Sequence, residues 1–263
     1  LEFKFGQGAK GTQPVNRIKN YDEAVRKVER GILVFPDPFD PKVIELREKG
    51  CCPNFYTYGR LPMWTEESMA KRIGELRDMG MKNVYFKMAG FDPADVERVI
   101  NMAADNKVDM ITFDGAGGGS GYSPSKMMNE WSLPTIMLEK AVVDICAKLD
   151  KQGKILPAMV MTGGFISEDQ IFKSLAYGDG FIQAIGVCRG AMAAAMTGKN
   201  VGNEIKAGRT PELFQKFGST IDEVFRDLAD LKGIYGKEAE SFSTGAIGVF
   251  SYLNKLGCGL RHF

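Results

Sequence analysis

The stretch from Met110 to Pro124, MITFDGAGGGSGYSP, contains the residues best suited to hold a ligand. An apolar run ends in the acid Asp114, and five glycines follow within the next seven residues. Glycines at this density let backbone N–H groups approach a ligand closely. A strand that leads through such a loop to a helix is the usual position of a ligand site in an α/β protein. A flexible surface loop is the alternative explanation.

Two later turns combine glycine with a following helix, which is the arrangement that binds phosphate through backbone dipoles. The first turn contains Thr162, Gly163 and Gly164, and the second contains Gly186, Arg189 and Gly190. Arg189 can add a charge-assisted contact to a phosphate oxygen. The alternative is that Gly163 and Gly164 only make a tight turn.

Lys87 lies inside an apolar predicted strand, VYFKMAG. A lysine between such neighbours is costly to bury without an anionic partner. Its ammonium group can face the electron-rich edge of a cofactor and stabilise the reduced form. A lysine at the exposed end of a strand is the alternative.

Polar side chains on two glycine-flanked turns are candidates for substrate contacts. Gln7 and Lys10 lie in the turn FGQGAK, where an amide and a cation can recognise a carboxylate. Asp114, Tyr122 and Ser123 lie on the glycine-rich loop and can donate or accept protons, and Tyr122 is the candidate proton donor. Asp114 can equally brace the loop.

The chain has one histidine, His262, at its second-last position. Serine and cysteine nucleophile systems and histidine-based zinc sites all need a histidine within the folded site. A residue this close to the end of the chain is a poor candidate for that role. If the protein is an enzyme, the difficult chemistry is therefore expected to belong to a cofactor.

Composition narrows the class of protein. The 263 residues suit one large α/β domain, and a net charge of +1, with no basic arm or stripe, argues against a nucleic-acid partner. No apolar run is long enough to span a membrane. The five cysteines are scattered, with no metal-ligand spacing, which predicts reduced thiols in the cytoplasm and no bound metal.

Short β-like runs alternate with amphipathic helical patterns, which predicts a parallel α/β sheet. Helices are expected from Thr65 to Met79, from Asp92 or Pro93 onward, from Leu133 to Leu149 and from Ser167 to Gly178. Strands are expected at Glu2–Gly6, Ile32–Pro36, Asn54–Tyr58, Asn83–Met88, Asp109–Asp114, Ile155–Thr162 and Phe181–Gly186.

Glycine-rich turns follow several of these strands, which favours a (β/α)₈ TIM barrel over an open sheet. Six or seven strands are visible where a closed barrel needs eight. We therefore expect residues 1–218 to form strands three to eight of a partial barrel, and residues 219–263 to form a C-terminal helical extension. The first residue is Leu1, and the first barrel strands are expected in a separate or removed N-terminal piece.

Five motifs in this order, GQGAK, VYFKM, DGAGGGSGYSP, MTGG and IGVCRGAM, resemble the FMN-binding synthase domain of the glutamate synthase family. The resemblance runs from about Leu1 to Met196. It implies an FMN-binding (β/α)₈ barrel in which a hydride passes from flavin N5 to the imine formed from 2-oxoglutarate and ammonia.

The resemblance also implies roles for single residues. Lys87 matches the lysine near the flavin, and Gly163, Gly164, Gly186, Arg189 and Gly190 match the phosphate loops. Gln7 and Lys10 match the residues that hold the 2-oxo acid, and Gly118, Gly119 and Ser120 match the loop beside flavin and substrate.

Two departures from the family pattern concern substrate and electron supply. GQGAK runs into GTQPVNR instead of a longer glycine- and proline-rich loop, and of the three cysteines that hold the family's iron–sulfur cluster only Cys188 is nearby. Without that cluster, electrons must arrive from a separate donor protein or from NAD(P)H.

The leading hypothesis is an FMN-dependent oxidoreductase that acts on a 2-oxo acid, an imine or an amino acid. One alternative is an FMN-binding subunit that transfers electrons or assembles a complex without turning over a small molecule. Another is a phosphate-binding barrel without flavin, such as a sugar-phosphate isomerase.

Overall fold

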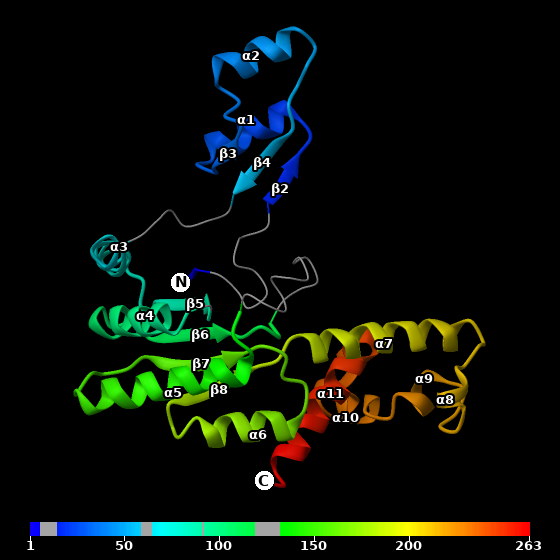
Figure 1. The fold of residues 1–263 in the computed structure, drawn as a ribbon. Coiled ribbons are helices and arrows are strands. Elements are labelled where there is room, and N and C mark those ends of the chain that lie inside the picture. Colours follow the sequence, from blue (N-terminus) through cyan, green and yellow to red (C-terminus); the bar gives the residue numbers. More distant parts are fainter. Residues whose placement is uncertain (6–14, 59–64, 91, 119–131) are drawn as a thin grey trace. The chain divides into compact units, whose positions relative to one another are not determined.

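The structure is a computed structural model that describes residues 1–5, 15–58, 65–90, 92–118 and 132–263 (Figure 1). The chain forms two compact units, Leu1–Gly163 and Gly164–Phe263, and each is described by itself.

A parallel sheet is the centre of the first unit. It contains β1 (Glu2–Lys4), β5 (Tyr85–Ala89), β6 (Met110–Asp114) and β7 (Ala158–Thr162), in that spatial order. In register, Lys4 lies opposite Lys87, Lys87 opposite Thr112, and Asp114 opposite Thr162. The predicted α/β class, with parallel strands connected through helices as in a (β/α)₈ barrel, is confirmed.

Side chains alternate across this sheet, as the period of two in a β-strand requires. One face is apolar, with Phe86, Phe113, Ile111, Met159 and Met161 fully buried. The opposite face carries Lys87, Thr112, Asp114 and Thr162. The apolar face makes the core of the unit, so the polar face is left to hold the candidate site.

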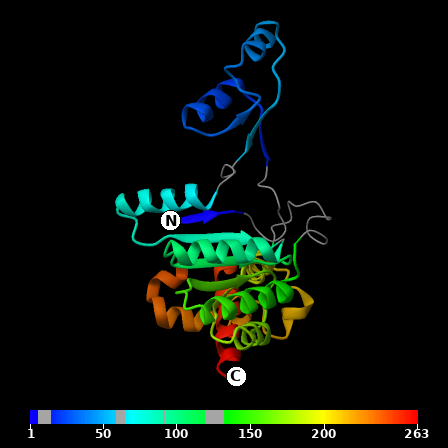
Figure 2. The same ribbon diagram turned by 60° about the vertical axis from the view of Figure 1, so that its left-hand side comes forward.

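Two helices run along the sheet, side by side, as Figures 1 and 2 show. They are α4 (Pro93–Asp105) and α5 (Thr135–Lys151). The buried face of α4 contains the predicted residues Val96, Val99, Ile100 and Ala103. The hydrophobic periodicity of the sequence therefore identified the correct face.

Two of the predicted helix starts are confirmed by capping contacts; at a third, Ser167 is the N-cap of α6 (Glu168–Tyr177) but its side chain makes no capping hydrogen bond, and the helix expected from Leu133 begins at Thr135. Thr65 and Ser68 form a reciprocal capping box at the start of α3 (Glu66–Asp78), and Asp92 caps α4 by accepting from Ala94 N at 2.8 Å. Glu66 in the first turn of α3 pairs with Arg98 of α4, and this hydrogen bond lowers the pKa of Glu66 to about 2.

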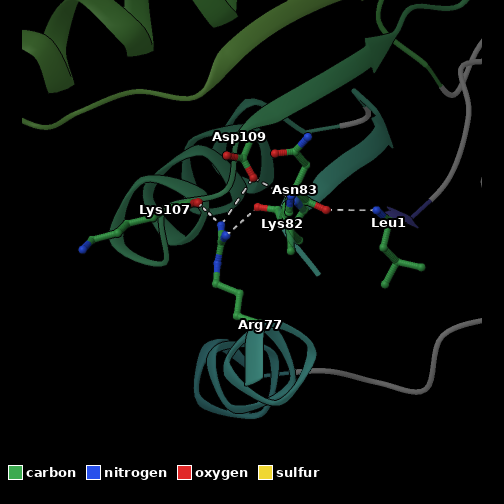
Figure 3. Close-up of polar contacts among 7 residues, drawn as sticks. Leu1, Arg77, Lys82, Asn83, Lys107 and Asp109 are labelled. Carbon is green, nitrogen blue, oxygen red and sulfur yellow. Dashed lines mark hydrogen bonds and ion pairs between the residues drawn. The ribbon is translucent and has the colours of Figure 1, made fainter. Parts of the chain in front are cut away.

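Arg77, near the end of α3, connects the segments that enter β5 and β6 (Figure 3). Its guanidinium donates to the carbonyls of Lys82, at 3.1 Å, and Lys107, and lies 3.3 Å from an Asp109 carboxylate oxygen. The same oxygen accepts from Val84 N at 2.8 Å. The Arg77 side chain therefore joins the segments before the amino ends of two neighbouring strands through hydrogen bonds and an ion pair.

A second, antiparallel sheet follows β1 along the chain. It contains β2 (Val15–Ile18), β4 (Phe55–Tyr58) and β3 (Val34–Phe35), in that order, with the helices α1 (Tyr21–Glu29) and α2 (Pro41–Glu48). Its own core consists of the buried residues Ile18, Ala24, Val34, Val43 and Phe55.

The expectation that the runs at Ile32–Pro36 and Asn54–Tyr58 join the parallel sheet was wrong. They form β3 and β4, which pair antiparallel, and β1 instead pairs directly with β5. The strand β2 was not predicted. A period of two is the same in parallel and antiparallel strands, so the pattern identifies a strand but not its partner.

The second unit contains one strand, β8 (Ile182–Gly186), and is otherwise helical. Its longest helices are α7 (Arg189–Lys206) and α11 (Thr244–Leu260), which pack against each other. The others are α6 (Glu168–Tyr177), α8 (Glu212–Gln215), α9 (Ile221–Val224), α10 (Leu228–Tyr235) and the 3₁₀ helix η2 (Gly236–Ser241). The helical pattern predicted after Ser219 is confirmed, although it is divided into short helices.

Candidate functional site

Lys87 and Asp114 form an ion pair on the polar face of the parallel sheet. Lys87 Nζ lies 4.0 Å from Asp114 Oδ2, and their side chains are 21% and 8% exposed. Ala89 lies opposite Asp114, so Lys87 is two residues earlier on the same face of β5. The anionic partner that burial of Lys87 requires is therefore present. At 4.0 Å the contact is an ion pair and not a hydrogen bond.

Thr162 holds Asp114 from the next strand. Its hydroxyl lies 2.6 Å from Asp114 Oδ1 and 3.2 Å from the carbonyl oxygen of Phe113. Thr162 and Asp114 lie opposite each other in the register of β6 and β7. The carboxylate is thereby fixed between a hydroxyl and a cation. Asp114 and Thr162 are the last residues of β6 and β7, and Lys87 lies two residues before the end of β5. In an α/β protein this edge of the sheet is where ligands bind.

The first glycines of the loop after β6 allow the backbone to turn close to this carboxylate. Gly118 N donates to Gly115 O at 2.8 Å, and Gly115 N donates to Thr162 O at 3.0 Å. A Cβ atom at position 118 would lie 1.7 Å from Asp114 Oδ1. Because Thr162 holds that oxygen, no other residue fits at position 118 without displacing Asp114.

Thr135, at the start of α5, is a site residue that the sequence did not indicate. Its hydroxyl donates to Gly163 O at 2.7 Å. Gly163 has a φ of +130°, and a Cβ atom there would lie 2.5 Å from Thr135 Oγ1. A side-chain hydroxyl in the first helical turn after Leu-Pro is too common a pattern to identify this contact from the sequence.

Six predicted residues lie outside the described residues, Ser123 of the glycine-rich loop among them. The others are the substrate candidates Gln7, Lys10 and Ser120, the flavin-loop residue Gly119 and the candidate proton donor Tyr122.

The remaining phosphate candidates belong to the second unit. Gly164 has a φ of +97°, a conformation that favours glycine, and Gly186 is the last residue of β8. Arg189 is the first residue of α7 and is exposed, and Gly190 follows it. A Cβ atom at Gly190 would lie 2.2 Å from the hydroxyl oxygen of Tyr252, so close packing already explains this glycine.

The amino ends of α6 and α7 differ in charge. The first turn of α6 contains Glu168 and Asp169, and hydrogen bonds from Ser167 and Lys173 lower the pKa of Asp169. The first turn of α7 contains no acidic residue and begins with Arg189. Since an anion is repelled by carboxylates and attracted by a helix amino end, α7 is the better of the two for a phosphate group.

Within the described part of the chain, the structure gives little support for a metal site or for a cysteine nucleophile. No group of three or more acidic, histidine or cysteine side chains there could hold a metal ion. Burial raises the pKa of the Cys146 thiol to about 12, so this cysteine is not a nucleophile near neutral pH. None of the helices described is both long enough and apolar enough to cross a membrane.

Comparison with known proteins places the chain in a family. The conserved region in glutamate synthase matches residues 60–198, which include Lys87, Asp114, Thr162 and Arg189. No curated protein matches the chain. Among solved structures, the YdjI aldolase from Escherichia coli K12 is 14% identical with a TM-score of 0.37, and the alignment covers 73% of this chain and 53% of the aldolase. Because the family match spans more than half of the residues, the chain belongs to the glutamate synthase family.

Proposed function

We propose that this chain is an FMN-dependent oxidoreductase that transfers a hydride between the flavin and a 2-oxo acid, an imine or an amino acid. The observation that supports it most directly is the position of Lys87. The motif VYFKM resembles the family strand with a lysine near the flavin, and residues 60–198 match the family's conserved region. The Lys87 ammonium lies on the polar face of the parallel sheet beside Asp114.

The residues present fit a flavin. A half-buried cation suits the electron-rich edge of the ring. Gly118 and Gly163 are already explained by their close packing on Asp114 and Thr135, so the fit rests on the charge of Lys87. Bound FMN would supply the hydride acceptor and donor at its N5 atom. The chain's own part is to hold the cofactor, to fix the Lys87 charge through Asp114 and Thr162, and to orient the substrate.

For the phosphate group of FMN we propose Gly164, Gly186, Arg189 and Gly190, with Arg189 and the amino end of α7 as its main contacts. The absence of acidic residues from the first turn of α7 supports this choice. Gln7, Lys10 and Ser120 remain proposed substrate contacts, and Tyr122 remains the proposed proton donor. A separate donor protein or NAD(P)H would supply the electrons.

The absorption spectrum of the purified protein with added FMN tests this function. Protein-bound flavin should absorb near about 375 and 450 nm and bleach with dithionite. Re-oxidation by one of a panel of 2-oxo acids with ammonia would identify an enzyme. A bound flavin that responds to none of the 2-oxo acids or amino acids, but exchanges electrons with a partner protein, would contradict the enzymatic part of the proposal.

Replacement of Lys87 by methionine tests the role of its charge. Hydrogen bonds to charged groups contribute about 1.5–3 kcal/mol, so Lys87→Met should weaken FMN binding or slow flavin reduction roughly 10-fold to 100-fold. Lys82→Met is the matched control, because Lys82 is exposed and precedes the amino end of the same strand (Figure 3). Equal flavin affinity and reduction rate in both variants would rule out the assigned role.

A further inference from the structure

Tyr252 of α11 contacts both of the segments to which a phosphate role is proposed within the second unit. Its hydroxyl donates to the carbonyl oxygen of Ile166 at 2.8 Å. Ile166 follows Gly164 by two residues and precedes Ser167, the N-cap of α6. The same hydroxyl packs against Gly190 in the first turn of α7, where a Cβ atom would lie 2.2 Å from its oxygen. One side chain therefore touches the start of two helices.

The helix that carries Tyr252 is held firmly in place. Gly248 of α11 packs so closely on α7 that a Cβ atom there would lie 2.5 Å from the carbonyl oxygen of Ala194. Near its end, Gly259 packs against the side chain of Glu168 of α6 in the same way, at 2.5 Å. Because α11 packs against both α6 and α7, the backbone of Tyr252 is held in a fixed position relative to the amino ends of these two helices.

The state of the hydroxyl suits a hydrogen-bond donor. Partial burial, together with the nearby charge of Glu168, raises the pKa of Tyr252 above its usual value. The phenol thus keeps its proton through the neutral range, and the bond to Ile166 O persists. A deprotonated phenolate at this position could only accept a hydrogen bond, and it would repel the carbonyl oxygen of Ile166.

We infer that Tyr252 is a positioning residue, which holds the Gly164–Ile166 segment and the amino end of α7 in the arrangement that receives a phosphate group. The inference rests on the proposed flavin function for the identity of the phosphate. Tyr252 lies outside residues 60–198, the region shared with glutamate synthase, so the family match assigns it no role.

Tyr252→Phe is the variant of choice because it removes the hydroxyl and keeps the ring. Its affinities for FMN and riboflavin should be measured side by side, since riboflavin lacks the phosphate. Loss of one neutral hydrogen bond should weaken FMN binding about threefold to tenfold and leave riboflavin binding unchanged. Tyr235→Phe, at an exposed tyrosine of α10, is the matched control and should change neither affinity.

Hydrogen exchange provides a second measurement that needs no flavin. In Tyr252→Phe, amides in residues 164–168 and 188–192 should exchange faster than in the wild type or in Tyr235→Phe, and the rest of α7 should be unaffected. Unchanged exchange at both segments would overturn the inference, with or without bound flavin. An equal loss of FMN and riboflavin affinity would also overturn it, because the effect would then not concern the phosphate.

The two proposals fail in different ways. A wild-type protein that binds neither FMN nor riboflavin would contradict the proposed function, and exchange alone would then decide the positioning role. A wild-type protein that binds FMN, with a Tyr252→Phe variant that binds it equally well, would contradict only the role of Tyr252.

Discussion

At the scale of single residues, the candidate site depends on a carboxylate that is held from two sides. The Asp114 side chain is 8% exposed, and a carboxylate this deep is costly unless it is paired and hydrogen-bonded. Lys87 supplies the charge and Thr162 the hydroxyl. The pair explains why a lysine is tolerated in this strand, and it fixes the ammonium without a direct hydrogen bond.

Thr162→Val tests the importance of the hydroxyl with almost no change of shape. Asp114 would lose a short hydrogen bond, and we expect the free energy of unfolding to fall by about 1.5–3 kcal/mol. Urea denaturation measures this change. Thr162→Ser keeps the hydroxyl and should lose less than half as much stability. Equal losses in the two variants would mean that packing of the methyl group, and not the hydrogen bond, matters here.

At the scale of secondary-structure elements, the second unit depends on the close approach of α7 and α11. Four glycines permit it, because a Cβ atom on any of them would meet backbone or side-chain atoms of the other helix at 2.9 Å or less; they are Gly198, Gly202, Gly245 and Gly248. This contact between α7 and α11 also holds in place the helix that contains Tyr252. Glycine costs helix propensity, so its use here reflects packing and not local preference.

Two alanine substitutions on α11 separate the effect of close helix packing from the effect of helix propensity. Gly248→Ala places a methyl group against the carbonyl of Ala194 and should cost about 1–3 kcal/mol. Gly257→Ala meets nothing within 4 Å and should add up to about 1 kcal/mol through helix propensity. Thermal unfolding of both variants measures the difference. Stabilisation by both substitutions would refute the tight contact.

At the scale of the whole molecule, the described part of the first unit has more than one core. The buried cluster around Phe55 takes all its members from residues 18–55, whereas the parallel sheet is packed around Phe86, Phe113 and Met161. Residues that share a core unfold together. Because the antiparallel sheet of β2, β3 and β4 has its own core, we expect it to unfold locally while the parallel sheet stays folded.

Phe55→Ala tests this independence. Removing a fully buried phenylalanine costs about 3–5 kcal/mol, which should unfold the small sheet locally. Hydrogen exchange should accelerate in residues 15–58 and stay slow in 110–114 and 158–162. Phe39→Ala, at an exposed position of the same segment, is the control. Equal acceleration in all three segments would show that the two sheets unfold together.

The sequence by itself determined the family and much of the local structure, although not β2, α1 or α2. Capping residues such as Thr65 and Asp92, and the apolar face of α4, are encoded by near neighbours, so these helices were predictable. The order of five short motifs indicated the glutamate synthase family, and the match over residues 60–198 confirms it. Lys87 was indicated by its position inside an apolar predicted strand, and Thr162 by its position in a glycine turn at the end of a strand.

Only the tertiary structure decided which distant segments meet. The antiparallel pairing of β3 and β4, the contact of Thr162 with Asp114 and the reach of Tyr252 to Ile166 join residues whose separation along the chain ranges from about twenty to 86. Strand pairing and side-chain packing depend on the free energy of the whole folded chain. A local sequence pattern therefore does not specify which strands pair or which side chains touch. For the same reason Thr135 and Tyr252 gave no signal until the fold brought them beside glycines.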